Sequence, residues 1–291
     1  TVLEERKEKL AETRIAGIRE IAPLNDREVE QSFIGLSGID PSSLFEPENT
    51  EKFERYARLQ KLLQFRHERI HSLPWQFVEP AEHQYHWETW DRMIELLKEN
   101  DIHIQLTLLG PPRWLLDRHF PGKEYRHLYD SIFAPVPDME KWREYCTLVA
   151  RRYGDSVKEF EIWNEVSEQS IFWPEGNAEQ FFELVKNASE AIKAVHPEAK
   201  IVAETLWPRQ NDFIHEIFRL GIAGYVDIHA DHYMNDLRIA QSREMLEKYV
   251  PGGILIDNET HTEAAGNPLG QVDDASRIRA AQMMVRNYFH H

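Results

Sequence analysis

The sequence has few of the features that mark disulfide-rich or membrane proteins. Its 291 residues include a single cysteine, Cys146, so no intrachain disulfide can form. No apolar run reaches the length of a transmembrane helix, and no signal-peptide pattern is present. We therefore expect no membrane partner. The sequence leaves open whether the chain is cytoplasmic or secreted with its signal removed, and it does not indicate an oligomeric state.

Positive charge is also scarce. The chain has 34 lysines and arginines against 50 aspartates and glutamates, for a formal net charge of −16. Such a chain repels phosphate backbones, and no basic run offsets this repulsion, so we expect no nucleic-acid partner. A neutral or weakly charged ligand such as a sugar fits this charge better.

Apolar residues are abundant enough for a large core. Hydrophobic residues make up 42% of the chain and aromatic residues 11%. This composition and length fit one domain of barrel size. We expect residues 1–291 to form a single catalytic domain, in which residues 1–30 form a surface helix and a connector.

Seven apolar segments alternate with helical patterns, which predicts an α/β fold with a parallel sheet. Seven such units favour a barrel over a doubly wound sheet. The long segment between residues 111 and 137 is predicted to be a functional loop. The expected strands, some with the loop that follows, span residues 33–39, 68–80, 102–110, 157–166, 200–208, 226–234 and 252–262.

The last helical pattern ends where an eighth strand should begin, so the expected barrel has no eighth strand in this chain. We expect a longer protein to supply that strand. Residues 13–22 are the alternative, as a substitute strand in the gap.

Two of the expected strands end in a glutamate. The first runs into Trp163, Asn164 and Glu165, and the second ends at Glu259. Ligands bind at the carboxyl ends of strands in parallel sheets and barrels, so both carboxylic acids are predicted to face one pocket. Strict alternation would turn Asn164 away from Glu165, whereas a bulge would let both face the pocket.

A strand that ends Trp-Asn-Glu, followed later by a strand that ends in Glu, resembles the glycoside hydrolases of clan A, the 4/7 superfamily of TIM-barrel enzymes. The stretch EIWNEVSEQSIFW is most similar to the β-xylosidase and α-L-iduronidase family, with cellulase-like families close behind. The resemblance implies a (β/α)8 TIM barrel that hydrolyses O-glycosidic bonds with retention and without a cofactor. It implies an oligosaccharide or glycoside substrate, with Glu165 as acid/base and Glu259 as nucleophile.

The same resemblance implies roles for four more residues. Asn164 would bind the sugar hydroxyl next to the anomeric centre, and Arg69 would lie beside the nucleophile and keep it ionised. His232 and Tyr233 would hydrogen-bond the site from the end of the sixth strand. The family usually separates that histidine and tyrosine by one residue, whereas here they are adjacent.

Four tryptophans lie at or just beyond predicted strand ends. Aromatic faces stack on the apolar faces of sugar rings, so these residues are candidate substrate contacts. Core packing is the alternative for each. They are Trp75, Trp114, Trp173 and Trp207.

Two other functions are consistent with parts of the sequence. The cluster His229, Asp231 and His232 has zinc-ligand chemistry, but strand alternation puts the two histidines on opposite faces, so we expect no metal. A carbohydrate-binding barrel without catalytic activity is the second alternative, and the two strand-end glutamates argue against it.

Overall fold

The computed structural model describes residues 35–39, 49–62, 65–166, 172–173, 176–206, 211–234 and 236–259. These residues belong to one compact unit, Phe33–His291. Four expectations concern residues outside these ranges: the helix and connector at 1–30, the substitute strand at 13–22, the eighth strand, and Trp207.

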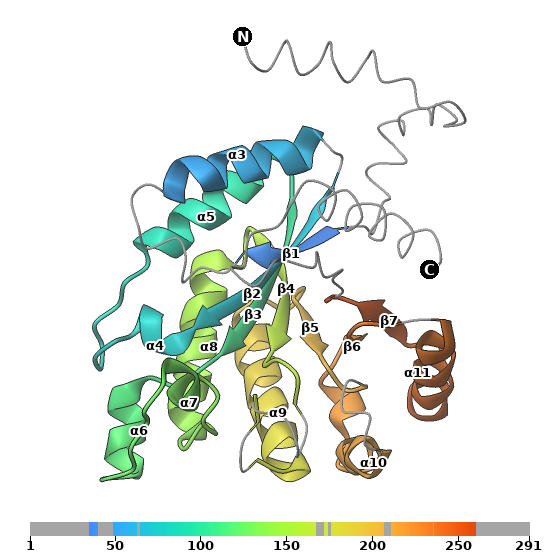
Figure 1. The fold of residues 1–291 in the computed structure, drawn as a ribbon. Helices are drawn as coiled ribbons and strands as arrows, with labels where there is room; N and C mark the ends of the chain where they lie inside the picture. The colour runs from blue at the N-terminus through green and yellow to red at the C-terminus, as the bar shows by residue number, and fades with distance from the viewer. Residues whose placement is uncertain are drawn as a thin grey trace, which may run out of the picture. The chain divides into compact units, whose positions relative to one another are not determined.

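The described residues form a seven-stranded sheet in which each strand pairs in parallel with the next strand of the chain (Figure 1). This order is that of a TIM barrel, in which helical crossovers join neighbouring parallel strands. The chain therefore has the predicted α/β fold of the (β/α)8 TIM-barrel class. The strands are β1 (Gly35–Ile39), β2 (His67–Pro74), β3 (His103–Leu109), β4 (Val157–Ile162), β5 (Lys200–Ala203), β6 (Ile228–Asp231) and β7 (Ile254–Asp257).

Helices follow β1 to β6, and two regions differ from the prediction. The segment expected to be a long loop contains α6 and α7, and a one-turn helix, α4, begins at Trp75 directly after β2. None of the described helices is both long and apolar enough to cross a membrane. The helices are α3 (Asn49–Leu62), α4 (Trp75–Val78), α5 (Glu88–Glu99), α6 (Arg113–His119), α7 (Leu128–Ile132), α8 (Met139–Tyr153), α9 (Ala178–Val195), α10 (Asn211–Arg219), the 3-10 helix η2 (Ile222–Gly224) and α11 (Asp236–Tyr249).

Local sequence explains where the two longest of these helices begin. The Asp138 side chain accepts hydrogen bonds from two backbone N–H groups in the first turn of α8. Asn177 and Gln180 form a reciprocal capping box at the start of α9. The buried stripe of α8 includes Trp142 and Cys146, so the single cysteine lies in the core.

The sheet separates two apolar regions. The main core includes α8, α9 and the apolar side chains of β3 and β4. A smaller cluster, formed by Val202, Ile228 and Ala230, is distinct from it. Glu204 and His232 share the parity of these small-cluster residues and lie just beyond the carboxyl ends of β5 and β6. Alternation therefore directs these two polar side chains toward the face that carries the small cluster.

Candidate active site

Six of the residues predicted from the sequence lie together on this face. One of them projects from β2, and the other five lie within three residues of the ends of β4, β6 and β7. They are Arg69, Asn164, Glu165, His232, Tyr233 and Glu259.

Arg69 joins most of this cluster. One terminal nitrogen donates to Glu259 Oε2 at 2.7 Å, and the other donates to Asn164 Oδ1 at 2.9 Å. Its Nε donates to Glu161 Oε2 at 2.7 Å. Burial alone would lower the pKa of Arg69, but the charges of Glu161, Glu204 and Glu259 outweigh burial and raise it. A permanent cation therefore lies against Glu259.

His232 lies between three carboxylates. Its Nδ1 is 3.2 Å from Glu165 Oε1 and 3.8 Å from Glu259 Oε2, while its Nε2 is 3.0 Å from Glu204 Oε1. Burial alone would lower the pKa of His232, but the charge of Glu204 and the hydrogen bond with Glu165 raise it to about 10. At neutral pH the ring is therefore an imidazolium that can donate from both nitrogens.

Tyr233 contacts Glu259 twice. Its hydroxyl donates to Glu259 Oε1, and its backbone N–H donates to the Glu259 carbonyl at 2.9 Å. Burial and the hydrogen bond to Glu259 raise the pKa of Tyr233, so the hydroxyl keeps its proton. Tyr233 has a left-handed φ of 50°. With this backbone its side chain reaches Glu259 although Tyr233 directly follows His232.

The backbone around Asn164 brings two consecutive side chains into the site. Neither strict alternation nor a bulge accounts for this, because β4 ends at Ile162, and Trp163 and Glu165 adopt left-handed φ values of 69° and 47°. Such values are uncommon for residues other than glycine and persist where the surroundings hold them. The Trp163 N–H donates to the Leu108 carbonyl at 3.0 Å, and the Glu165 N–H donates to the Glu204 carboxylate.

The two strand-end glutamates face each other across a short gap. One carboxylate oxygen of Glu165, one of Glu259 and a His232 ring nitrogen all lie within 4.8 Å of one another. The Glu165 side chain is 12% exposed and the Glu259 side chain 21%. Both carboxylates therefore reach solvent, where a substrate can meet them.

Sequence reasoning missed two buried carboxylates. Neither Glu161, on β4, nor Glu204, directly after β5, was among the candidate site residues. Both are almost completely buried, and both contact Arg69. For Glu161, its position between two apolar residues of the strand, Phe160 and Ile162, was the available signal, because buried charges require partners.

The spacing of the carboxylates would also suit a metal ion, but two protein cations already lie among them. Arg69 contacts Glu161, Glu204 and Glu259, and the His232 imidazolium lies among the same groups. A metal cation would have to displace or repel these charges. The two sets with ligand spacing are Glu161, Glu204 and His232, and Glu165, His232 and Glu259.

The other members of the candidate zinc cluster lie elsewhere. His229 Nδ1 is 2.8 Å from the Thr205 hydroxyl, and the ring packs against Phe218 of α10. Asp231 is paired with Arg238 of α11. As alternation predicts, His229 and His232 point to opposite faces of β6.

Three of the four candidate tryptophans lie in the described part of the chain, and they are outside the glutamate cluster. Trp75 stacks on Tyr145 with ring centroids 5.0 Å apart, and its indole N–H donates to Glu79. Trp173 is buried edge-on against Trp163. For these two residues the core alternative holds. Trp114 is half-buried, and its indole N–H donates to the Glu79 carbonyl at 3.1 Å.

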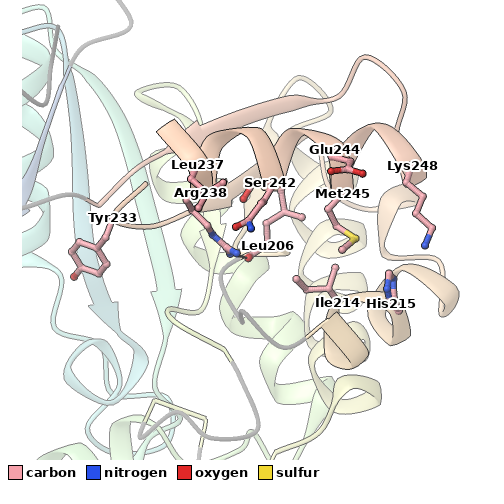
Figure 2. Close-up of a pocket in the computed structure, with 11 residues that line it drawn as sticks. Leu206, Ile214, His215, Tyr233, Leu237, Arg238, Ser242, Glu244, Met245 and Lys248 are labelled. Atoms are coloured by element: carbon pink, nitrogen blue, oxygen red, sulfur yellow. Dashed lines mark hydrogen bonds between the residues drawn. The ribbon is translucent and has the colours of Figure 1, made fainter. Parts of the chain in front are cut away.

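A cavity of about 620 Å³ lies between α10 and α11 (Figure 2). Arg238 projects into it and donates to the Leu206 carbonyl while its guanidinium also binds Asp231. Among the clustered site residues only Tyr233 borders this cavity. The cavity is therefore distinct from the pair of strand-end glutamates.

Known proteins resemble this chain at the level of sequence. The sequence model of glycosyl hydrolases family 39 matches residues 53–249. A beta-xylosidase from Caldicellulosiruptor saccharolyticus is 33% identical over 132 residues, which cover 41% of this chain and 26% of that protein. A beta-xylosidase from Geobacillus stearothermophilus is 25% identical over 139 residues, covering 40% and 27% respectively. The matched segment thus spans about a quarter of each curated relative.

Solved structures share the fold. A monomeric beta-xylosidase from Caulobacter crescentus CB15 superposes with a TM-score of 0.60 at 19% identity, over 80% of this chain and 52% of that chain. The GH39 enzyme from Xanthomonas axonopodis pv. citri superposes with a TM-score of 0.59 at 17% identity, over 77% and 50%. At these identities the likeness supports the fold alone.

Proposed function

Because the chain belongs to glycosyl hydrolases family 39, we propose that it is a retaining glycosidase that hydrolyses β-xylosides. Glu165 is the acid/base in this proposal, and Glu259 is the nucleophile. The substrate follows the names of the curated relatives, both beta-xylosidases. The two residue roles follow the contacts of the strand-end glutamates.

The observation that carries the proposal is the short distance between the two carboxylates, whose facing oxygens lie within 4.8 Å. Retaining glycosidases place their carboxyl groups about 5 to 5.5 Å apart, whereas inverting enzymes need about 6.5 to 9.5 Å to admit a water molecule. The separation therefore favours direct attack by a carboxylate on the anomeric carbon.

The neighbours of the two glutamates favour this assignment of roles. Glu259 accepts hydrogen bonds from the Arg69 cation and the Tyr233 hydroxyl, which suits an ionised nucleophile. Asn164 uses its carbonyl oxygen for Arg69, so its amide N–H₂ group can donate to a sugar hydroxyl. Glu165 faces the same gap and can reach the leaving oxygen.

The proposed reaction has two steps. Glu259 forms a covalent bond to the anomeric carbon as the glycosidic bond breaks, and Glu165 gives its proton to the leaving oxygen. Glu165 then takes a proton from water as that water attacks the anomeric carbon and releases Glu259. Two inversions leave the product with the configuration of the substrate.

Variants of the two glutamates test the assignment with aryl β-xylosides. Glu259→Ala should abolish hydrolysis, and azide should restore turnover with an α-xylosyl azide product. Glu165→Ala should retain turnover of substrates with good leaving groups and lose turnover of poor ones. Near-wild-type turnover by Glu259→Ala, or of substrates with poor leaving groups by Glu165→Ala, would contradict the assignment. Xyloside binding without hydrolysis by the wild type would favour a non-catalytic barrel.

A further inference from the structure

We propose that the two buried carboxylates, Glu161 and Glu204, are positioning residues, and that each of them positions a different catalytic glutamate. Glu161 holds the nucleophile Glu259, and Glu204 holds the acid/base Glu165. This inference rests on the proposed function and adds two residues to it.

Two routes lead from Glu161 to the nucleophile. Glu161 accepts hydrogen bonds from Arg69 Nε at 2.7 Å and from the Asn258 side-chain amide, and the Thr107 hydroxyl completes its shell. Arg69 continues to Glu259 Oε2, and Asn258 is the residue directly before Glu259. Glu161 thus fixes both the cation beside the nucleophile and the backbone that carries it.

A carboxylate is the group that this position needs. Burial alone would raise the pKa of Glu161, but the charge and hydrogen bond of Arg69 outweigh burial and lower it. Glu161 therefore stays ionised inside the barrel and compensates Arg69. Without this charge, the buried guanidinium of Arg69 would lose its ion pair with β4. Arg69 would then no longer be held in the orientation in which it donates to Glu259.

Two different routes lead from Glu204 to the acid/base. Glu204 Oε2 accepts the backbone N–H of Glu165, whose left-handed φ needs such support. Glu204 Oε1 lies 3.0 Å from His232 Nε2, and the other nitrogen of that ring lies 3.2 Å from Glu165 Oε1. Glu204 thus holds the backbone of Glu165 directly and its carboxylate through an imidazolium.

The two sets of contacts overlap only weakly. Arg69 is 2.7 Å from Glu161 but 3.3 Å from Glu204. Glu161→Gln should therefore impair the nucleophilic step, and Glu204→Gln should impair proton transfer. A residue that only stabilises the fold would impair both steps to the same extent.

Two assays separate these steps. The first is the rate at which a 2-deoxy-2-fluoro-β-xyloside with an activated leaving group inactivates the enzyme, which depends on nucleophilic attack. The second is the ratio of kcat/KM for activated and unactivated xylosides, which depends on the acid. Glu159→Gln is the matched control, since Glu159 lies on β4 two residues before Glu161 and is half-buried. It should leave both readouts unchanged.

We expect Glu161→Gln to slow inactivation about 100-fold, the loss that a misplacement of about 1 Å can cause, with little change in the leaving-group ratio. We expect Glu204→Gln to raise that ratio at least about 10-fold, toward the range of general-acid effects of about 10² to 10⁴, with little change in inactivation. Equal losses in both assays for both variants, or no change in either variant, would overturn the inference.

The outcomes also separate this inference from the proposed function. A wild-type enzyme that the fluoro-xyloside does not label would refute the proposed function itself. If circular dichroism shows that the glutamine variants do not fold, Thr107→Val replaces Glu161→Gln and Glu204→Asp replaces Glu204→Gln. The first should then affect only inactivation, and the second only the leaving-group ratio. Thr107→Val removes a single donor to Glu161, so it should slow inactivation several-fold and leave the leaving-group ratio unchanged.

Discussion

If His232 is charged in the folded chain, the free energy of unfolding should depend on pH, and this can be measured without a substrate. Burial disfavours this charge, but Glu204 and Glu165 raise the pKa of His232 from 6.5 to about 10 in the folded chain. A raised folded-state pKa stabilises the protein fully below pH 6.5, and this stabilisation is lost as the pH rises through 10. A shift of that size corresponds to about 5 kcal/mol at 1.36 kcal/mol per pKa unit.

Replacing His232 by glutamine should remove this pH dependence. The difference in unfolding free energy between wild type and His232→Gln should shrink by about 1.4 kcal/mol per pH unit between pH 7 and 9.5. In this range the folded wild type holds a proton on His232 and releases it on unfolding, whereas the variant has no such proton. Urea denaturation at half-unit pH intervals, followed by tryptophan fluorescence, measures this difference.

His229 on the same strand provides the control. Burial lowers the pKa of His229 to about 4, so its contribution changes between about pH 4 and 6.5. The unfolding free energy of His229→Gln should therefore change with pH in parallel with that of the wild type above pH 7. Parallel curves for wild type and His232→Gln between pH 7 and 9.5 would refute the assignment of an imidazolium to the site.

Two further predictions concern the fold. Gly176→Ala should destabilise the chain by about 1 to 3 kcal/mol, because the added Cβ would lie 2.0 Å from Trp173 Nε1. Gly224→Ala, which meets nothing within 4 Å, should be nearly neutral, and equal melting temperatures for the two variants would contradict this packing. Arg238→Leu should cost about 3 to 5 kcal/mol in chemical denaturation, because it leaves Asp231 buried without its cation. A loss below about 1 kcal/mol, the value of an exposed ion pair, would show that the pair is not a buried one.

The sequence predicted the strand order and the two strand-end glutamates because both follow from simple regularities. Alternating strands and helices require a parallel sheet, and the carboxyl ends of parallel strands meet at one edge. The family match confirms the resemblance carried by the Trp-Asn-Glu strand end. For these features, pattern and spacing along the chain were sufficient.

Other features depend on tertiary contacts and were not predictable from local patterns. Left-handed φ values at Trp163, Glu165 and Tyr233 oppose the preferences of those residues, and contacts with residues distant in the sequence hold them. Trp75 and Trp173 lie at or just beyond predicted strand ends, and a tryptophan at such a position can either line a pocket or pack in the core. The sequence pattern alone does not distinguish the two.

The most direct test of the central claim is the identity of the residue that forms the covalent intermediate. Wild-type protein inactivated with a 2-deoxy-2-fluoro-β-xyloside is digested, and the labelled peptide is sequenced by mass spectrometry. The label should lie on Glu259. A label on Glu165 or on any other residue would contradict the assignment of the nucleophile, and hydrolysis that releases α-xylose as the first product would contradict the retaining mechanism.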